Sequence, residues 1–130
     1  MRAVERFLWV CLAGAAGTGL RYLVGLWLPA RPGGLALSTL VVNVLGCFLM
    51  GLAAHVAARG SVVSPDLRAV LTVGFLGGLT TYSAFNYETT RLLQDGFPRA
   101  ALVNFSVTAL ACFAAGVAGL ATAHRLLSGD

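Results

Sequence analysis

Apolar residues dominate the chain in four long runs, at about residues 7–28, 35–57, 67–93 and 99–126. Short turns that contain proline, glycine or charged residues separate these runs. An α-helix needs about 20 apolar residues to cross the hydrocarbon core of a bilayer, whereas membrane β-barrels show strands of about ten residues with alternating polarity. The pattern therefore predicts an all-α integral membrane fold, in which residues 1–130 form one domain of four transmembrane helices.

Composition and charge support the membrane assignment. Hydrophobic residues make up 58% of the chain and charged residues 11%, whereas roughly a quarter of a soluble protein is charged. The net charge of +4 comes from arginine alone, and the arginines are scattered singly near the ends of the runs. Such residues anchor helices at the bilayer surface and influence their orientation. We therefore expect the lipid bilayer as the surroundings and no nucleic acid as a partner.

One stretch of the third run does not suit a helix that only crosses lipid. Residues 74–88 read GFLGGLTTYSAFNYE and carry glycines, hydroxyl residues, an asparagine and a carboxylate. Gly77 and Gly78 each weaken a helix by about 1 kcal/mol relative to alanine. A broken backbone at membrane depth is tolerated only where protein or a watery cavity satisfies its polar groups, and such breaks mark ion or substrate sites in transporters. We predict that the third helix is broken near Gly77–Tyr82.

Three other polar residues within the runs each allow two interpretations. Asn43 is an isolated amide that needs a hydrogen-bond partner in an apolar medium, so it either joins two helices or faces a pore as a donor. The hydroxyl of Thr108 either bonds back to its own helix or faces that pore. Arg21, near the end of the first run, is either a surface anchor or an arginine that points inward.

Glu88 is a candidate functional residue because carboxylates inside membrane spans are rare and costly. The alternative is an ion pair with Arg91 on the next helical turn, or with a partner arginine.

The cysteines and histidines show no catalytic or metal-binding spacing. Cys11, Cys47 and Cys112 lie far apart within apolar runs and are expected to be small packing residues. His55 and His124 lack a ligand partner at useful spacing, so we expect both at the bilayer surface. The sequence contains no P-loop and no nucleophile–base pair, and we predict that the protein is not an enzyme.

The arginines barely favour one orientation in the membrane. Four spans place five of them on one side: Arg2, Arg6, Arg59, Arg68 and Arg125. The other side receives three, with Arg21 nearer to that side: Arg31, Arg91 and Arg99. Because orientation depends on this difference, the chain can insert either way. No internal repeat is visible, so inverted symmetry would have to come from two oppositely inserted copies, related by a twofold axis in the membrane plane.

Three motifs carry a resemblance to the Fluc family of fluoride channels, also called CrcB proteins, over essentially the whole chain. The first run reads GAAGTGLRY, similar to the family's glycine-rich stretch that ends in Arg-Tyr. Thr39–Gly51 reads TLVVNVLGCFLMG and matches the family pattern Thr-Leu-x-x-Asn-x-x-Gly-x-Phe-x-x-Gly at every anchor. Gly74–Phe85 reads GFLGGLTTYSAF, close to the family's Gly-Phe-x-Gly-Gly-x-Thr-Thr-Phe-Ser-Thr-Phe.

The resemblance implies a passive, fluoride-selective channel in the inner cell membrane that exports cytoplasmic fluoride and confers fluoride resistance. It also implies an antiparallel, dual-topology homodimer with two pores and a structural sodium ion at the dimer interface. By this resemblance, backbone carbonyls of Gly77 and Thr80 bind the sodium. Carbonyl oxygens suit such an ion, and two helix breaks that meet at a twofold axis would form a small oxygen cage.

The resemblance also assigns the pore. The family's pore asparagine corresponds to Asn43 and its pore aromatics to Tyr82 and Phe85, whose ring edges carry a partial positive charge suited to an anion. The remaining expected pore residues are hydroxyl donors and two charged residues: Thr81, Ser83, Thr108, Glu88 and Arg21. Two positions depart from the family pattern, because Tyr82 replaces a phenylalanine and Ala84 a threonine.

Two other functions remain as alternatives. A proton-coupled exporter of the small multidrug resistance kind also has four short spans, but it needs a carboxylate in mid-membrane in its first span, and this chain has none there. A membrane scaffold subunit that transports nothing would use Asn43 and the hydroxyl residues only to hold helices together.

Overall fold

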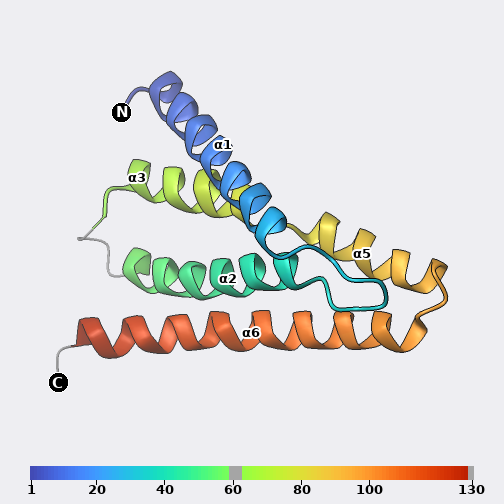
Figure 1. The fold of residues 1–130 in the computed structure, drawn as a ribbon. Coiled ribbons are helices and arrows are strands. Elements are labelled where there is room, and N and C mark those ends of the chain that lie inside the picture. Colours follow the sequence, from blue (N-terminus) through green and yellow to red (C-terminus); the bar gives the residue numbers. More distant parts are fainter. Residues whose placement is uncertain (59–62, 129–130) are drawn as a thin grey trace.

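The protein is a bundle of helices, as a computed structural model that describes residues 1–58 and 63–128 shows (Figure 1). Three helices are long: α1 (Ala3–Trp27), α2 (Leu37–Ala58) and α6 (Pro98–Ser128). Between α2 and α6 the chain forms four shorter helical segments: α3 (Pro65–Ala69), the π-helical η1 (Val70–Leu76), α4 (Gly77–Leu79) and α5 (Tyr82–Gln94). The prediction of an all-α fold is confirmed. Arg59, which is predicted to lie on the same side of the membrane as Arg2, is outside the described residues.

Three of these helices are long and apolar enough to cross a bilayer: Ala3–Trp27, Leu37–Val56 and Pro98–Leu127. The third run does not form one continuous helix of that kind, because it is divided into the segments from α3 to α5. Many of its large apolar side chains, and those of the long helices, are exposed on the chain's own surface. Apolar faces of this extent require hydrocarbon or another protein surface around them, and the chain is a multi-pass membrane protein.

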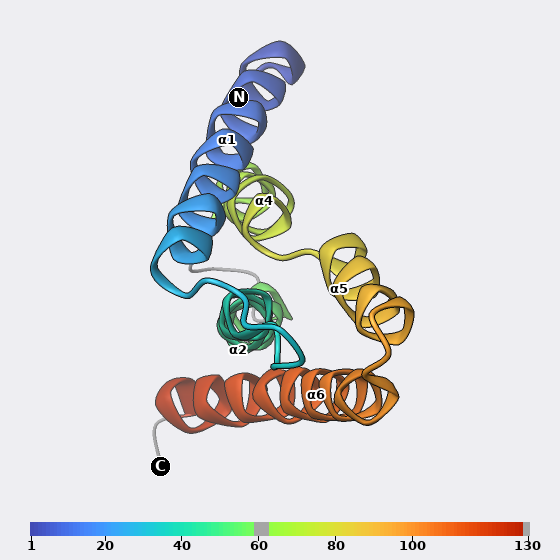
Figure 2. The same ribbon diagram turned by 45° about the vertical axis from the view of Figure 1, so that its right-hand side comes forward.

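The path through the bundle alternates in direction. The N-terminus, the end of α2, the start of α3 and the C-terminus lie at one end of the bundle (Figure 1). α2 and α6 therefore both run toward this end; they cross at an angle (Figure 2) and share the most extensive helix contact of the fold. A Cβ atom at Gly51 would overlap the carbonyl oxygen of Gly116, so glycine lets the two backbones approach closely.

Glycine also brings α1 close to the divided segment. α1 packs mainly on η1 and α4. A Cβ at Gly17 would overlap the carbonyl oxygen of Phe75, and one at Gly78 would overlap that of Gly14. Gly77 and Gly78 are both within α4 and helical. At least at Gly78, the sequence therefore uses glycine for close packing.

The interruption lies just after the glycine pair, at Thr80 and Thr81. Thr80 has φ −84° and ψ 157°, and Thr81 has φ −157° and ψ 117°, so both are extended. Figure 2 shows this stretch as the link between α4 and α5. The prediction of a break near Gly77–Tyr82 is confirmed, but the residues that leave the helix are the threonines and not the glycines.

An ion-pair cluster joins the starts of α1 and α3 outside the apolar spans. The amino group of Met1 lies 2.6 Å from Asp66 Oδ2, and Arg6 Nη1 lies 3.2 Å from Asp66 Oδ1. The hydrogen bond from the Met1 amino group, reinforced by the charges of that group and of Arg6, lowers the pKa of Asp66 below its usual value. The same hydrogen bond raises the pKa of the Met1 amino group.

Candidate functional site

Asn43 on α2 holds the helix break. Its side chain is only 8% exposed, and its Nδ2 donates to the carbonyl oxygen of Thr81 at 3.0 Å. The backbone N–H of Thr81 donates to Asn43 Oδ1 at 2.7 Å. One amide side chain thus satisfies both backbone polar groups of an extended residue, which would be costly to leave unpaired in a buried position.

This pair of hydrogen bonds removes a helical donor from the backbone carbonyls of α4. In a continuous α-helix the N–H of Thr81 would donate to the carbonyl of Gly77, but here it donates to Asn43. The last carbonyls of a helix need other partners. The hydroxyl of Thr18 donates to the Gly78 carbonyl at 3.4 Å, and Arg21 Nη1 donates to the Thr80 carbonyl at 3.4 Å. Of the two interpretations of Arg21, the structure favours the one in which it points inward.

The first turn of α5 is fixed by hydroxyl groups. Thr81 is its N-cap, and Thr81 Oγ1 accepts from the N–H of Ala84 at 3.1 Å. The hydroxyls of Thr81 and Ser83 lie 3.1 Å apart. Thr80 turns its hydroxyl back, donating to the Leu76 carbonyl at 2.9 Å. Thr81 Oγ1 therefore contacts both the backbone N–H of Ala84 and the hydroxyl of Ser83.

A groove of about 410 Å³ lies beside the break, between α2, α5 and α6. Apolar, aromatic, hydroxyl and thiol groups line it: Asn43, Gly46, Cys47, Met50, Thr80, Thr81, Tyr82, Phe85, Phe105, Thr108, Ala109 and Cys112. The groove brings together five of the expected pore residues: Asn43, Thr81, Tyr82, Phe85 and Thr108. Ser83, Glu88 and Arg21 are not among the lining residues, although Ser83 contacts Thr81.

Three aromatic rings form a row along this groove. The ring centroids of Tyr82 and Phe85 are 5.6 Å apart at an interplanar angle of 60°, an edge-to-face arrangement. Phe85 stacks on Phe105 with centroids 5.8 Å apart. Phe85 is 5% exposed, whereas Tyr82 is 75% exposed. No sequence pattern distinguishes Phe105, since a phenylalanine in an apolar run looks like any lipid-facing residue.

Glu88 contacts α2 and not Arg91. The hydroxyl of Thr39 donates to Glu88 Oε1 at 2.8 Å, while Glu88 Oε2 is buried without a hydrogen-bond partner among the described residues. Arg91 pairs instead with Asp95, at 3.6 Å between Nε and Oδ2. The expected alternative of an ion pair between Glu88 and Arg91 is therefore wrong.

Asn104 on α6 was not singled out as a site residue, yet it joins three elements. It is 1% exposed. Its Oδ1 accepts from the N–H of Ala36, just before α2, at 3.2 Å, and its Nδ2 donates to Thr89 Oγ1 on α5 at 2.9 Å. Thr89 Oγ1 in turn donates to the carbonyl of Phe85 at 2.7 Å. The available signal was its place on one helical stripe with Thr108.

The extensive contact between α2 and α6 pairs residues that are far apart in sequence. The rings of His55 and His124 lie with centroids 5.4 Å apart, and Cys47 and Cys112 line the same groove. Sequence spacing indicated neither pair. Within the described residues, no group of three or more His, Cys, Asp and Glu side chains is arranged to hold a metal ion.

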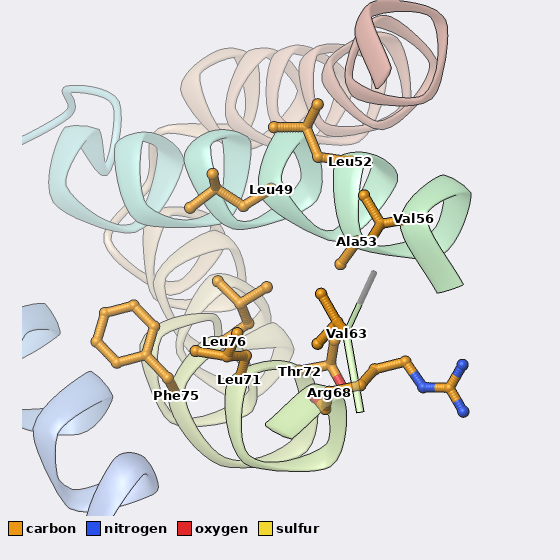
Figure 3. A pocket seen from close by; sticks show the side chains of 10 residues that line it. All are labelled: Leu49, Leu52, Ala53, Val56, Val63, Arg68, Leu71, Thr72, Phe75 and Leu76. Atoms are coloured by element: carbon orange, nitrogen blue, oxygen red, sulfur yellow. The ribbon is translucent and has the colours of Figure 1, made fainter. Parts of the chain in front are cut away.

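A second hollow, of about 380 Å³, lies between the C-terminal half of α2 and the α3–η1 segment (Figure 3). Nearly all of its lining is apolar: Leu49, Leu52, Ala53, Val56, Val63, Arg68, Leu71, Thr72, Phe75 and Leu76. Figure 3 shows the guanidinium group of Arg68 pointing away from the other labelled side chains. An ion that loses hydration water needs polar groups in return, so this hollow does not suit ion passage.

Comparison with known proteins agrees with the motifs. Residues 8–120 match the family of CrcB-like proteins (Camphor Resistance, CrcB). The chain is 44% identical to a protein of Sorangium cellulosum called fluoride-specific ion channel FluC, over 97% of this chain and 100% of that protein. It is 46% identical to a protein of the same name from Geobacter metallireducens, over 90% of this chain and 95% of that protein. The match spans nearly the full length on both sides, and the chain belongs to the CrcB family.

Proposed function

We propose that this protein is a passive, fluoride-selective channel that exports fluoride from the cytoplasm across the inner cell membrane. The observation that carries the proposal is the groove beside the Asn43-held break, where hydroxyl groups and aromatic edges meet in a membrane-spanning chain. Relatives that are similar over nearly the whole chain are called fluoride-specific ion channels. Hydrogen fluoride enters acid-exposed cells as a neutral molecule and dissociates inside, so a passive pore is sufficient to release the ion.

The lining of the groove suits a small, strongly hydrated anion. Removing water from fluoride is costly unless other donors replace it, and the hydroxyls of Thr81 and Thr108 lie where they can do so. The edges of Tyr82 and Phe85 offer partial positive charge without a fixed cation that would trap the ion. Several modest sites allow an ion to leave as well as enter.

Asn43 combines the two roles that its sequence position suggested. An amide nitrogen carries two N–H donors, and one of them is used by the Thr81 carbonyl. Asn43 also lines the groove. In this proposal its first N–H holds the break, and its second faces the passing anion.

We further propose that two oppositely inserted copies pair at their breaks to form two pores around one structural sodium ion. Support comes from the Gly77 carbonyl, which loses its helical donor because Thr81 bonds to Asn43. One chain would supply two oxygens, from Gly77 and Thr80, so a cage of four needs a second copy. Carbonyl oxygens fit a hard cation. Arg21 Nη1 lies 3.4 Å from the Thr80 carbonyl oxygen. A hydrogen bond of this length is weak, so in this proposal it does not prevent the oxygen from binding sodium.

Glu88 and Arg21 lie outside the set of residues that line the groove. Glu88 lies one or two turns beyond the groove on α5 and is bound by Thr39, and Arg21 lies at the break. We assign them to the polar ends of the ion pathway, where they influence the entry and release of the anion and do not contact it at the narrowest point.

The test is fluoride release from liposomes that contain the purified protein, followed with a fluoride electrode after valinomycin is added to clamp the potassium current. Fast fluoride release without a pH gradient, with little release from chloride-loaded liposomes, is the expected result. Release only in the presence of a proton gradient would identify the coupled exporter instead. An absence of release under both conditions would leave the scaffold subunit as the function.

A further inference from the structure

Two free cysteines on different helices meet at the groove. Cys47 on α2 and Cys112 on α6 are both partly buried and both line it. The backbone of α6 is close at this point, because the carbonyl oxygen of Cys47 lies 3.7 Å from the Cβ position of Gly116, one turn after Cys112. The two cysteines therefore approach the same groove from two helices whose backbones are close at this point.

The pair lies one helical turn beyond two expected pore residues. Cys47 follows Asn43 by four residues on α2, and Cys112 follows Thr108 by four residues on α6. Residues four apart lie on the same face of a helix. The thiols therefore continue the polar lining of the groove on both helices.

We propose that Cys47 and Cys112 form a two-thiolate site for a soft metal cation such as Hg²⁺, Ag⁺ or Cu⁺, and that the bound cation closes the groove. Thiolates are the protein ligands that soft cations prefer, and two sulfur ligands complete the linear coordination of these ions. The effect on transport rests on the proposed function, whereas the binding itself does not.

The binding step is balanced without a redox partner. Each thiol releases its proton to the solvent, two metal–sulfur bonds form, and no electron is transferred. With Hg²⁺ the product is neutral, which favours it in surroundings of low polarity. Metal–thiolate bonds are about 2.3 Å long, so the two sulfurs of such a site lie within about 4.6 Å. Two thiols that line the same groove on closely packed helices can reach this separation by side-chain rotation.

The first test measures binding alone. In the Cys11→Ser protein, Cys47 and Cys112 are the only thiols left. Titration with Hg²⁺ should give thiolate-to-metal absorption in the ultraviolet that saturates at one ion per chain, with two protons released per ion. Adding Cys47→Ser or Cys112→Ser should weaken binding by about 100-fold or more, because the second ligand no longer acts intramolecularly. Misfolding of the serine variants is controlled with Cys47→Ala and Cys112→Ala. An unchanged elution volume shows that these variants are folded, and their Hg²⁺ binding should be weakened in the same way.

Equal affinity of the parent and both single variants would overturn the site, because it would mean that the thiols bind independently. The same conclusion would follow if saturation required two ions per chain.

The second test measures fluoride release from liposomes. Stoichiometric Hg²⁺ should slow release through the Cys11→Ser protein by about tenfold or more if the ion obstructs the path, and a thiol chelator should restore it. Proteins with Cys47→Ser or Cys112→Ser should keep their release rate at the same Hg²⁺ concentration. Tight binding with unchanged release would overturn the closure of the groove. If the untreated protein releases no fluoride, the proposed function fails, and the titration still decides the metal site.

Discussion

The two sides of the helix break are held in different ways. On the α1 side, α4 packs through glycines whose missing side chains let backbone meet backbone. On the α2 and α6 side, hydrogen bonds of Asn43 hold the break, and a hydrogen bond from Asn104 holds the middle of α5 at Thr89. The glycines allow α4 to pack closely on α1. The amide side chains orient the break, because their hydrogen bonds determine which groups face the groove. The comparison teaches that this break is anchored by backbone packing on one side and oriented by hydrogen bonds on the other.

Removing the Asn43 amide should have the largest effect on this arrangement. Asn43→Ala leaves the N–H and the carbonyl of Thr81 without partners, at about 1–3 kcal/mol for each buried group. We expect a large loss of stability in chemical denaturation and little remaining fluoride release. Asn43→Asp, which keeps an acceptor but loses the donor, should also slow release. Asn86→Ala, which changes an exposed amide on α5, serves as the control, and equal behaviour of the Asn43 and Asn86 variants would refute the role of Asn43.

Filling the glycine contact should be the next largest change. Gly17→Val places a side chain against the Phe75 carbonyl and the backbone of Leu79, and overpacking of this kind costs typically 1–3 kcal/mol or more. Gly19→Val is the matched control on the same helix, since nothing lies within 4 Å of its Cβ position. Thermal melting in detergent should separate the two variants clearly. A similar melting temperature for both would show that α1 adapts to side chains at this contact.

Changing the aromatic row should affect transport more than stability. Phe85→Ile keeps an apolar side chain but removes the ring edge, so we expect fluoride release to fall by about tenfold. Tyr82→Phe keeps the ring, removes the hydroxyl and matches the family pattern, so its release rate should stay close to that of the parent. Rates are read from the fluoride electrode with equal amounts of protein. Normal release through Phe85→Ile would place the ion path elsewhere.

The smallest expected effect is that of pH on the contact between α1 and α3. Because the pKa of Asp66 is lowered in the folded protein, its stabilising effect is full above the usual aspartate pKa of 3.8 and is lost as the pH falls through the folded value. The pKa of the Met1 amino group is raised above 8.0, so its contribution is full below pH 8.0 and is lost at higher pH. The difference in melting temperature between the parent and Asp66→Asn should therefore be largest near neutral pH and shrink at both extremes. A difference that does not change with pH would contradict the ion pair.

The sequence predicted the helical class and the position of the break because both depend on local patterns. Long apolar runs suffice for the first, and a cluster of glycine and hydroxyl residues suffices for the second. The cause of the break was not predictable in the same way. Gly77 and Gly78 have low helix propensity but remain helical, since tertiary packing on α1 overrides that preference.

The contacts between helices could not be predicted from the sequence. Asn43 needed a partner, but only the packing of α2 against the break identifies Thr81 as that partner. The pairs Cys47–Cys112 and His55–His124 depend on the extensive contact between α2 and α6. Helical spacing offered Arg91 as an alternative partner for Glu88, and the observed partner, Thr39, depends on where α5 faces.

The hydrogen bonds between Asn43 and Thr81 have a consequence for biogenesis. Both partners belong to the same chain, so a newly inserted chain can pair these polar groups with its own side chain. The backbone of Thr81 is therefore never exposed to lipid once α2 has packed against the break, and the interruption needs no external donor or acceptor at this residue.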